Sequence, residues 1–378
     1  MVDLLDGLRT ALAGLGRPHT AADVARAMRE LGAVVTDATV GDALEALRRN
    51  SVGAGPLEDL LNGPGVSDVL VNGPLDVFVD RGVGPERVPL TFPDDEAVRQ
   101  LAIRLAAACG RRLDDAQPFV DGRLPSGVRV HAVLAPVAEP GTCISLRVPA
   151  RRSFSLDDLV AAGSLSDEGA SLLRGLVSQR VPYLVSGGTG SGKTTLLAAL
   201  LGLVPEAERI VLVEDARELV PAHPHCVRLE GRPANAEGAG AITLTTLVRQ
   251  ALRMRPDRLV LGEVRGAEIT DMLSALNTGH EGGCATVHAN SVADVPARLE
   301  ALAALGGLGR EACHAQVVAA LRVVVHVRRD AAGRRYVEQV GVIRRSSAGL
   351  EVILGAALHT DGVTYGAAGA ELRALVAP

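Results

Sequence analysis

The sequence predicts an α/β protein in which a parallel sheet, covered by helices on both faces, follows a smaller α+β domain and a short helical segment. Two observations support this prediction. From residue 157 onward, short apolar runs alternate with helical patterns, which is the order that a covered parallel sheet requires. Between residues 55 and 148, alternating β patterns surround one amphipathic helix, as in an α+β domain. The predicted boundaries are 1–52 for the helical segment, 55–148 for the α+β domain, 149–156 for a hinge and 157–378 for the α/β domain.

Length and composition limit the classes of protein that fit. A chain of 378 residues is long for one domain, and 47% hydrophobic residues are enough to build large cores. A net charge of −5 with 2% aromatic residues argues against a protein that coats nucleic acid, so we expect no direct nucleic-acid binding. The five cysteines form no C-x-x-C pair, which argues against a disulfide framework or a zinc site. Since the sequence has no signal-peptide pattern and no apolar run near about 18 residues, it predicts a soluble, cytoplasmic protein.

The first 52 residues have helical patterns. Leucines recur at helical spacing between residues 4 and 15, and further helices are expected over 20–31 and 37–50. The stretch 53–56 has the glycine and proline content of a linker. No pattern in this segment indicates a function.

In the α+β domain, strands over 66–71 and 75–79 predict a hairpin, because Asn72-Gly73 is a preferred turn pair. A helix is expected over 94–109, where Gly110 stops it, and two further strands over 128–134 and 142–148.

In the α/β domain, four apolar runs predict parallel strands, and helices are expected between them. Three later β runs should extend the sheet as a meander. The four strands are expected over 182–186, 209–213, 258–262 and 283–287, the helices over 244–254 and 267–278, and the meander over 321–327, 335–343 and 350–357.

A glycine-rich loop joins the first of these strands to a following helix. It reads Ser-Gly-Gly-Thr-Gly-Ser-Gly-Lys-Thr-Thr and contains the Gly-x4-Gly-Lys-Thr pattern of a phosphate-binding loop. Inward-facing backbone N–H groups and the helix N-terminus both attract phosphate oxygens. The expected phosphate-binding residues are Gly187, Gly188, Thr189, Gly190, Ser191, Gly192, Lys193, Thr194 and Thr195.

Lys193 is the only lysine among the 39 basic residues of the chain. An ammonium group is a compact point charge that fits between the β- and γ-phosphates, whereas a planar guanidinium would crowd the loop. The alternative is a glycine-rich turn that happens to precede a lysine. That alternative explains neither the flanking strand and helix nor the choice of lysine at this one position.

Carboxylates follow two of the predicted strands. Glu263 comes after the strand over 258–262, and ligands of open α/β sheets bind at the carboxyl ends of strands. No aspartate precedes Glu263, so it either holds water, positions a metal through water, or both; we favour it as the residue that polarises the attacking water. The alternative is that Glu263 is a helix-capping or surface glutamate with no role in catalysis. Thr194 is the expected Mg²⁺ ligand, and Glu214 and Asp215, which end another strand, are expected to act near the metal with Glu263.

Three more residues lie near the expected nucleotide. Arg217 is available for phosphate or for a neighbouring subunit. His280 and His288 flank a glycine-rich strand, which favours a sensor of the γ-phosphate. A lone histidine is more often structural. A metal site is disfavoured here because no C-x-x-C pair partners the two histidines.

The second β section of the α+β domain has more arginines than carboxylates, although the whole chain is acidic. A solvated surface is one explanation, and arginines that reach a triphosphate held by the other domain are the second. The pattern does not separate the two. The arginines are Arg111, Arg112, Arg123, Arg129, Arg147, Arg151 and Arg152, against Asp114, Asp115, Asp121 and Glu139.

Four boxes occurring in order resemble the secretion ATPases of type II and type IV secretion systems, including pilus-assembly and conjugation motors. They are the glycine loop, Val213-Glu-Asp215, Gly262-Glu-Val-Arg265-Gly266, and the stretch from Gly279-His to Thr286-Val-His288-Ala-Asn-Ser291. Upstream, Leu70-Val-Asn-Gly-Pro74, Asp121-Gly-Arg-Leu-Pro-Ser-Gly-Val-Arg129-Val-His131 and Ile144-Ser-Leu-Arg147 resemble the N-terminal domain of the tight-adherence (Flp) pilus branch. The resemblance covers about residues 55–345.

This resemblance implies a RecA-like P-loop NTPase domain that hydrolyses ATP with Mg²⁺. By it, Lys193 and Thr194 bind phosphate and Mg²⁺, and Glu263 is catalytic together with Lys193, the acidic-box Glu214 and the histidine-box His288. The resemblance also matches three arginines of this chain to family residues that close on the nucleotide. We expect three further side chains to contact the nucleotide as well. The matched set is Arg123, Arg129 and Arg147, and the further set is Arg217, Arg265 and His280.

The resemblance further implies a homohexameric ring that is cytoplasmic and docks at the inner face of the membrane on a platform protein. The chain lacks the four-cysteine zinc element of general type II secretion motors, which favours the pilus and conjugation branches. A ring-shaped DNA translocase is an alternative that the acidic pI and the few aromatic residues disfavour. An ATP-gated assembly scaffold with little turnover is the second alternative.

Overall fold

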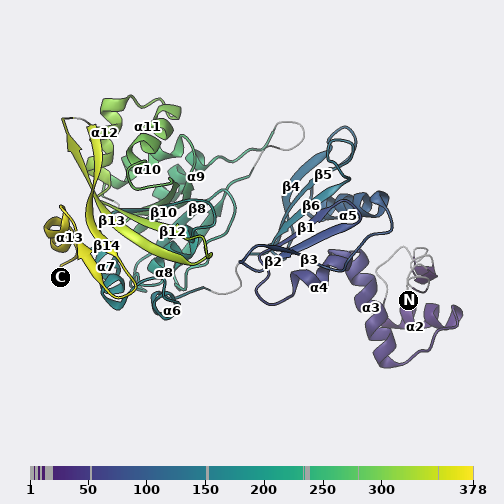
Figure 1. The fold of residues 1–378 in the computed structure, drawn as a ribbon. Coiled ribbons are helices and arrows are strands. Elements are labelled where there is room, and N and C mark those ends of the chain that lie inside the picture. Colours follow the sequence, from purple (N-terminus) through teal and green to yellow (C-terminus); the bar gives the residue numbers. More distant parts are fainter. Residues whose placement is uncertain are drawn as a thin grey trace. The chain divides into compact units, whose positions relative to one another are not determined.

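The computed structural model describes residues 4, 7–8, 11–12, 20–51, 53–149, 153–232, 234, 239–279, 281–347 and 349–377, without the side chains of 45–51. These residues belong to two compact units, 1–149 and 150–378 (Figure 1). Much of the predicted leucine-rich helix over 4–15, together with His280, lies outside the described residues.

The helices predicted after residue 20 are confirmed. Helix α2 (Ala21–Glu30) begins after Thr20, whose hydroxyl accepts a hydrogen bond from the Asp23 N–H while the Asp23 carboxylate accepts one from the Thr20 N–H at 2.9 Å. This reciprocal pair satisfies two N–H groups that a helix start otherwise leaves unpaired. Helix α3 (Asp37–Ser51) follows, and Val24, Met28 and Val40 are buried in a small core between the two helices.

The rest of the first unit is a six-stranded antiparallel sheet in the order β3-β2-β1-β6-β5-β4. Helix α5 (Asp95–Ala108) shares one core with it. Val69 and Val71 of the sheet are fully buried with Val98 and Leu105 of the helix. The strands are β1 (Asp68–Asn72), β2 (Asp76–Asp80), β3 (Pro85–Arg87), β4 (Phe119–Arg123), β5 (Arg129–Val133) and β6 (Cys143–Arg147).

The predicted hairpin is confirmed as the β1–β2 pair, in which Asn72 is the register partner of Asp76 and Gly73 has φ +72°. The predicted linker over 53–56 is wrong. Ala54 and Leu57 are buried in the sheet's core, and the segment forms a 3-10 helix η1 (Gly55–Leu57) followed by α4 (Glu58–Leu61). Its glycine and proline build a tight turn against the core instead of a free connection.

The second unit is built on a nine-stranded sheet in the order β15-β14-β13-β12-β7-β11-β10-β8-β9. The run from β12 to β9 is parallel, and β13 to β15 continue from β12 as an antiparallel meander. Both features confirm the prediction. The strands are β7 (Tyr183–Gly187), β8 (Ile210–Glu214), β9 (Cys226–Glu230), β10 (Arg258–Val264), β11 (Cys284–His288), β12 (Val323–Arg329), β13 (Arg335–Ser346), β14 (Gly349–Leu358) and β15 (Val363–Tyr365).

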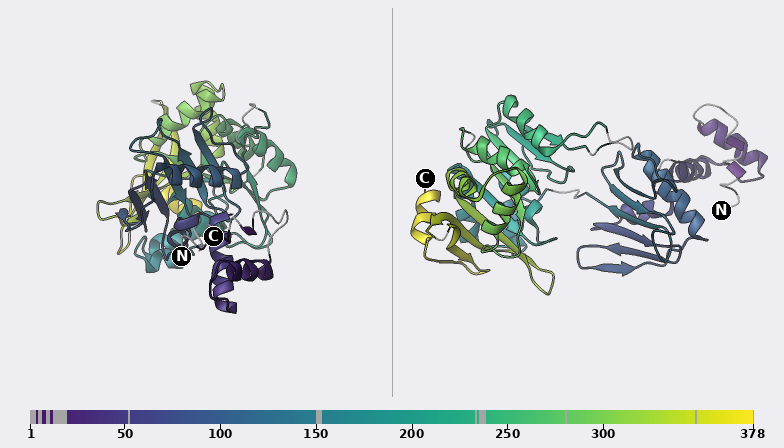
Figure 2. Two further views of the ribbon diagram at one scale, coloured as in Figure 1. Left: turned by 90° about the vertical axis from the view of Figure 1, so that its right-hand side faces the viewer. Right: turned by 90° about the horizontal axis from the view of Figure 1, so that it is seen from above.

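Helices cover both faces of this sheet (Figure 2). The central strands are buried on both sides, because alternate residues enter different cores: Leu212 packs in one core and Val211 and Val213 in the other. On one face lie α6 (Leu156–Ala161), α7 (Asp167–Ser178), α8 (Lys193–Leu201) and α13 (Gly369–Val376); on the other lie α9 (Leu244–Ala251), α10 (Glu268–Leu276), α11 (Val295–Leu305) and α12 (Arg310–Ala320). Among the described residues, no helix combines the length and the apolar composition needed to cross a bilayer.

Candidate functional site

The glycine loop connects β7 to α8 at the carboxyl edge of the parallel strands. Gly192 caps the helix with φ +100°, a left-handed conformation that side-chain-bearing residues rarely adopt. A Cβ at Gly187 would lie 2.4 Å from the Val327 carbonyl oxygen and 2.5 Å from the Ser191 hydroxyl. The loop therefore requires glycine at both positions, and the first N–H groups of α8 have no carbonyl partner within the helix.

Lys193 is the first residue of α8, and its ammonium group bends back over the loop. It donates hydrogen bonds to the carbonyl oxygens of Gly187 at 3.0 Å and Gly188 at 2.9 Å. Burial lowers the pKa of Lys193, and the nearby charge of Glu263 opposes that shift by raising it. The charges of the loop lysine and of Glu263, near the end of β10, thus act on each other.

Glu263 lies near the end of β10 and is held by Arg265. The Arg265 Nε donates to a Glu263 carboxylate oxygen at 2.9 Å, and the Glu263 side chain keeps 29% exposure. The ion pair raises the pKa of Arg265 above its ordinary value. The carboxylate is therefore oriented and partly open to water, which suits a group that must bind a water molecule.

Glu214 ends β8 beside this strand, and its side chain is only 3% exposed. One carboxylate oxygen accepts from the N–H groups of Glu218 at 2.9 Å and Leu219 at 2.8 Å. The other oxygen is buried without a hydrogen-bond partner, 3.6 Å from a nitrogen of Arg228. Burial raises the pKa of Glu214. The Glu214 side chain thus orders the turn after β8 through one oxygen, while its other oxygen has no hydrogen-bond partner.

The remaining predicted residues of this unit lie at the ends of neighbouring strands. His288 ends β11 and is the register partner of Gly187, so it lies at the same sheet edge as the glycine loop. Asp215 is exposed after β8, and Arg217 forms an ion pair with Glu230 of β9 at 3.2 Å.

Sequence reasoning missed two residues that contact the loop. Arg335, at the start of β13, donates from Nε to the Gly190 carbonyl at 2.9 Å. His326, in β12, forms a hydrogen bond with Ser186 immediately before the loop. The only local signal for His326 is one polar residue inside the apolar run Val323 to Val327.

A cavity of about 310 Å³ opens beside the loop and the first turn of α8. Phe154 lies at its edge with 41% exposure, in a chain that has four phenylalanines, three tyrosines and no tryptophan. The lining is mainly apolar, as in small-molecule sites. It comprises Phe154, Leu159, Ala162, Ser164, Ser191, Gly192, Thr195, Leu196, Val327, Arg334, Arg335, Tyr336 and Val337.

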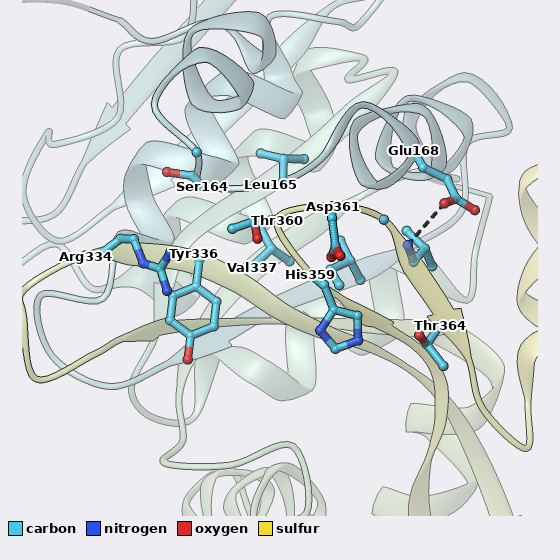
Figure 3. A pocket seen from close by; sticks show the side chains of 14 residues that line it. Ser164, Leu165, Glu168, Arg334, Tyr336, Val337, His359, Thr360, Asp361 and Thr364 are labelled. Atoms are coloured by element: carbon cyan, nitrogen blue, oxygen red, sulfur yellow. Dashed lines mark hydrogen bonds between the residues drawn. The ribbon is translucent and has the colours of Figure 1, made fainter.

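A second hollow of about 680 Å³ shares Ser164, Arg334, Tyr336 and Val337 with this cavity. It extends to the β14–β15 turn, where the Glu168 carboxylate accepts from the Val363 N–H at 3.1 Å (Figure 3). Its polar groups come from several elements and include both signs of charge. These polar groups do not indicate one class of ligand.

In the first unit, the three predicted arginines form one row. Arg123 is the cross-strand partner of Arg129, and Arg129 is the partner of Arg147. Directly opposed residues of an antiparallel sheet share a face, so three guanidinium groups lie in adjacent positions. Asp121 is 3.5 Å from Arg129 and Asp68 is 3.3 Å from Arg147.

Within the described part of the chain, no three His, Cys, Asp or Glu side chains are grouped to hold a metal ion. Oxygen donors in this part of the site include the Thr194 hydroxyl in the first turn of α8 and the Glu263 carboxylate, whose charge acts on Lys193. Mg²⁺ usually takes one or two protein ligands and fills its other positions with phosphate oxygens and water. This small, hard donor set fits Mg²⁺ bound together with a phosphate ligand.

Comparison with known proteins agrees with this geometry. The family described as Type II/IV secretion system protein matches residues 50–347. A putative conjugal transfer protein of Mycobacterium tuberculosis is 55% identical over 316 residues, covering 82% of this chain and 90% of the relative. The type IV secretion system protein PtlH of Bordetella pertussis is 37% identical over 258 residues, covering 62% of this chain and 76% of PtlH.

Two solved structures share the fold. The ATPase DotB of Legionella pneumophila has a TM-score of 0.52 at 19% identity and covers 77% of this chain and 80% of its own. The pilus retraction motor PilT has a TM-score of 0.51 at 18% identity and covers 82% of each chain. The predicted α/β, RecA-like fold is confirmed.

Proposed function

This chain belongs to the type II/IV secretion system protein family, and on that basis we propose that it is an ATP-hydrolysing motor of a conjugation, pilus or secretion machine. The observation that carries the proposal is the glycine loop with Lys193 beside Glu263. A cation inside a ring of backbone amides binds a polyphosphate, and a carboxylate beside it orients water for in-line attack on the terminal phosphate.

Each residue of the loop edge has a role in this scheme. The amides of Gly188 to Thr195 and the Lys193 ammonium bind the phosphates, while Glu263 polarises the attacking water. Arg265 keeps the Glu263 carboxylate in place through their ion pair. His288 contacts the terminal phosphate from the neighbouring strand end, since its backbone is paired with Gly187.

Thr194 and Glu263 would hold Mg²⁺, with Glu214 and Asp215 acting through water. When bound, Mg²⁺ neutralises charge on the β- and γ-phosphates. We place the nucleoside in the 310 Å³ cavity, because that cavity begins at Gly192 and Thr195 and carries the exposed ring of Phe154. We further propose that Arg217 and Arg335 contribute positive charge toward the phosphates; Arg335 already contacts the loop at Gly190.

The arginine row of the first unit supports a second contact with the nucleotide. Like charges directly opposed across a sheet are destabilising. Asp121 and Asp68 pair with two of these arginines, and an anionic ligand would add to that compensation. We propose that Arg123, Arg129 and Arg147 meet the phosphates when the two units close about the hinge. Arg129→Ala should then lower turnover severalfold while leaving the fold intact.

At the level of assembly, we propose a homohexamer at the cytoplasmic face of the inner membrane that docks on a platform protein. The 55% identity with a conjugal transfer protein supports the conjugation and pilus branches over protein export. Direct nucleic-acid binding is not part of the proposal, given the net charge of −5.

Electron microscopy with Mg·ATP, combined with steady-state hydrolysis, tests the proposal. We expect six-fold rings and hydrolysis that increases when membranes containing the machine are added. Rings without hydrolysis in either condition would favour an ATP-gated scaffold. Hydrolysis stimulated by DNA and not by membranes would favour a DNA translocase.

A further inference from the structure

His326 is a buried histidine beside the phosphate loop for which the scheme above has no role. It lies on β12 as the register partner of Ser186 on β7, and its side chain is 2% exposed. Its Nδ1 is 2.8 Å from the Ser186 hydroxyl, which is itself fully buried. Ser186 is the last residue before Gly187, so the ring holds the point at which the strand turns into the loop.

The same ring reaches a second segment of the site. It lies near the backbone of Asn290, which favours the protonated form of the ring. Asn290 follows His288 by two residues, so one imidazole bridges the strand before the phosphate loop and the segment after the histidine-box residue.

The surroundings of the ring favour its neutral form. Burial lowers the pKa of His326, and the charges of Arg328 and Lys193 lower it further, while Glu338 of β13 raises it from 4.0 Å. A neutral ring with its proton on Nε2 accepts from the Ser186 hydroxyl at Nδ1. It does so without placing another positive charge next to Lys193.

We propose that His326 is a positioning residue that couples the phosphate loop to the segment around His288. The proposal rests on the proposed ATPase activity, because it concerns how that site is held in shape. A histidine that only fills the core would affect stability alone. A coupling histidine fixes the distance between the groups that bind the phosphates and the group that contacts the terminal phosphate. Its loss therefore lowers the rate of the chemical step.

The full-length chain with His326→Phe tests this role, because phenylalanine keeps a ring of similar size and removes the hydrogen bond to Ser186. We expect kcat to fall about tenfold, with KM for ATP within about twofold, since loss of one oriented contact in the transition state has that size. Ser186→Ala should lower kcat in the same direction. The double variant should be no worse than the more affected single variant, because both remove one interaction.

His314→Phe is the matched control. His314 is likewise buried, with its side chain 1% exposed, and bonds Glu300 at 2.7 Å, away from the phosphate loop. It should lose stability but keep kcat. Unchanged kcat in His326→Phe, or additive losses in the double variant, would overturn the coupling role. If His326→Phe does not fold, Ser186→Ala decides by itself, and wild-type kcat in that variant counts against the proposal.

Amide hydrogen exchange separates this inference from the proposed activity. With or without turnover, His326→Phe and Ser186→Ala should exchange faster at residues 187–192 and at 288–291 together, and His314→Phe should not. Unchanged exchange at both segments contradicts the coupling even in an active enzyme. A wild-type chain that shows the coupled exchange but no hydrolysis would contradict the proposed function and leave the coupling in place.

Discussion

Glu263 is the residue whose proposed role separates nucleotide binding from hydrolysis. Glu263→Gln keeps the side chain's size and its acceptor for Arg265, but an amide polarises water poorly. We expect hydrolysis to fall at least about 100-fold, as is typical when a general base is removed, with ATP affinity within a few-fold. Calorimetry and phosphate release on the same preparation measure the two quantities.

The control for that variant is Glu371→Gln. Glu371 on α13 forms an ion pair with Arg344 of β13, and neither residue has a role in the proposed site. It should leave both affinity and turnover at wild-type levels. Comparable hydrolysis by Glu263→Gln and the wild type would remove Glu263 from the mechanism.

Individual site residues could be predicted from the sequence where the chemistry needs residues that are adjacent in the chain. The glycine loop and its lysine are adjacent in the chain, and Glu263 could be placed because a parallel strand delivers its last residue to one sheet edge. His326 and Arg335 could not be predicted. Their contacts span 140 and 145 residues in sequence, and only the pairing of β12 with β7 brings them to the loop.

Two neighbouring strand ends, β8 and β10, depend on one glycine. A Cβ at Gly262 would lie 2.6 Å from the Glu214 Cγ, closer than side chains approach. Glu214 in turn holds the N–H groups of the turn after β8. Gly262→Ala should therefore displace Glu214 and destabilise the protein by roughly 1–3 kcal/mol, the usual cost of overpacking. Urea denaturation of the full-length chain measures the change.

Gly309→Ser is the control for that experiment. Gly309 is the N-cap residue of α12 with φ −66°, and a Cβ there meets nothing within 4 Å. Serine is a preferred N-cap residue, so this variant should be neutral or slightly stabilising. Equal stabilities of Gly262→Ala and Gly309→Ser would show that the strand ends tolerate the added methyl group.

Elements with a strong pattern were predicted well, and elements without one were missed. The central strands were recognised because burial on both faces makes them continuous apolar runs. Strand β3 (Pro85–Arg87) has three exposed residues, and the edge strand β9 (Cys226–Glu230) is only half-buried, so neither shows an apolar run. Helices α11 and α12 are rich in alanine, which blurs the boundary between their apolar and polar faces.

Three features of the whole molecule support the proposed function. They are the phosphate loop of the second unit, the arginine row of the first unit, and membership of the type II/IV secretion system protein family. The parallel sheet with its meander followed from alternating patterns along the chain. The packing of the segment at 53–56 did not, because glycine and proline serve both free linkers and tight turns. Burial of Ala54 and Leu57 is a tertiary property that composition does not record.

The most direct test of the central claim is phosphate release from Mg·ATP by the purified full-length chain, beside Lys193→Ala and Lys193→Arg. We predict steady hydrolysis by the wild type and loss of at least about 100-fold in both variants, because the loop accommodates a compact ammonium and not a guanidinium. Hydrolysis by Lys193→Ala at the wild-type rate, or none by the wild type with or without membranes, would contradict the account.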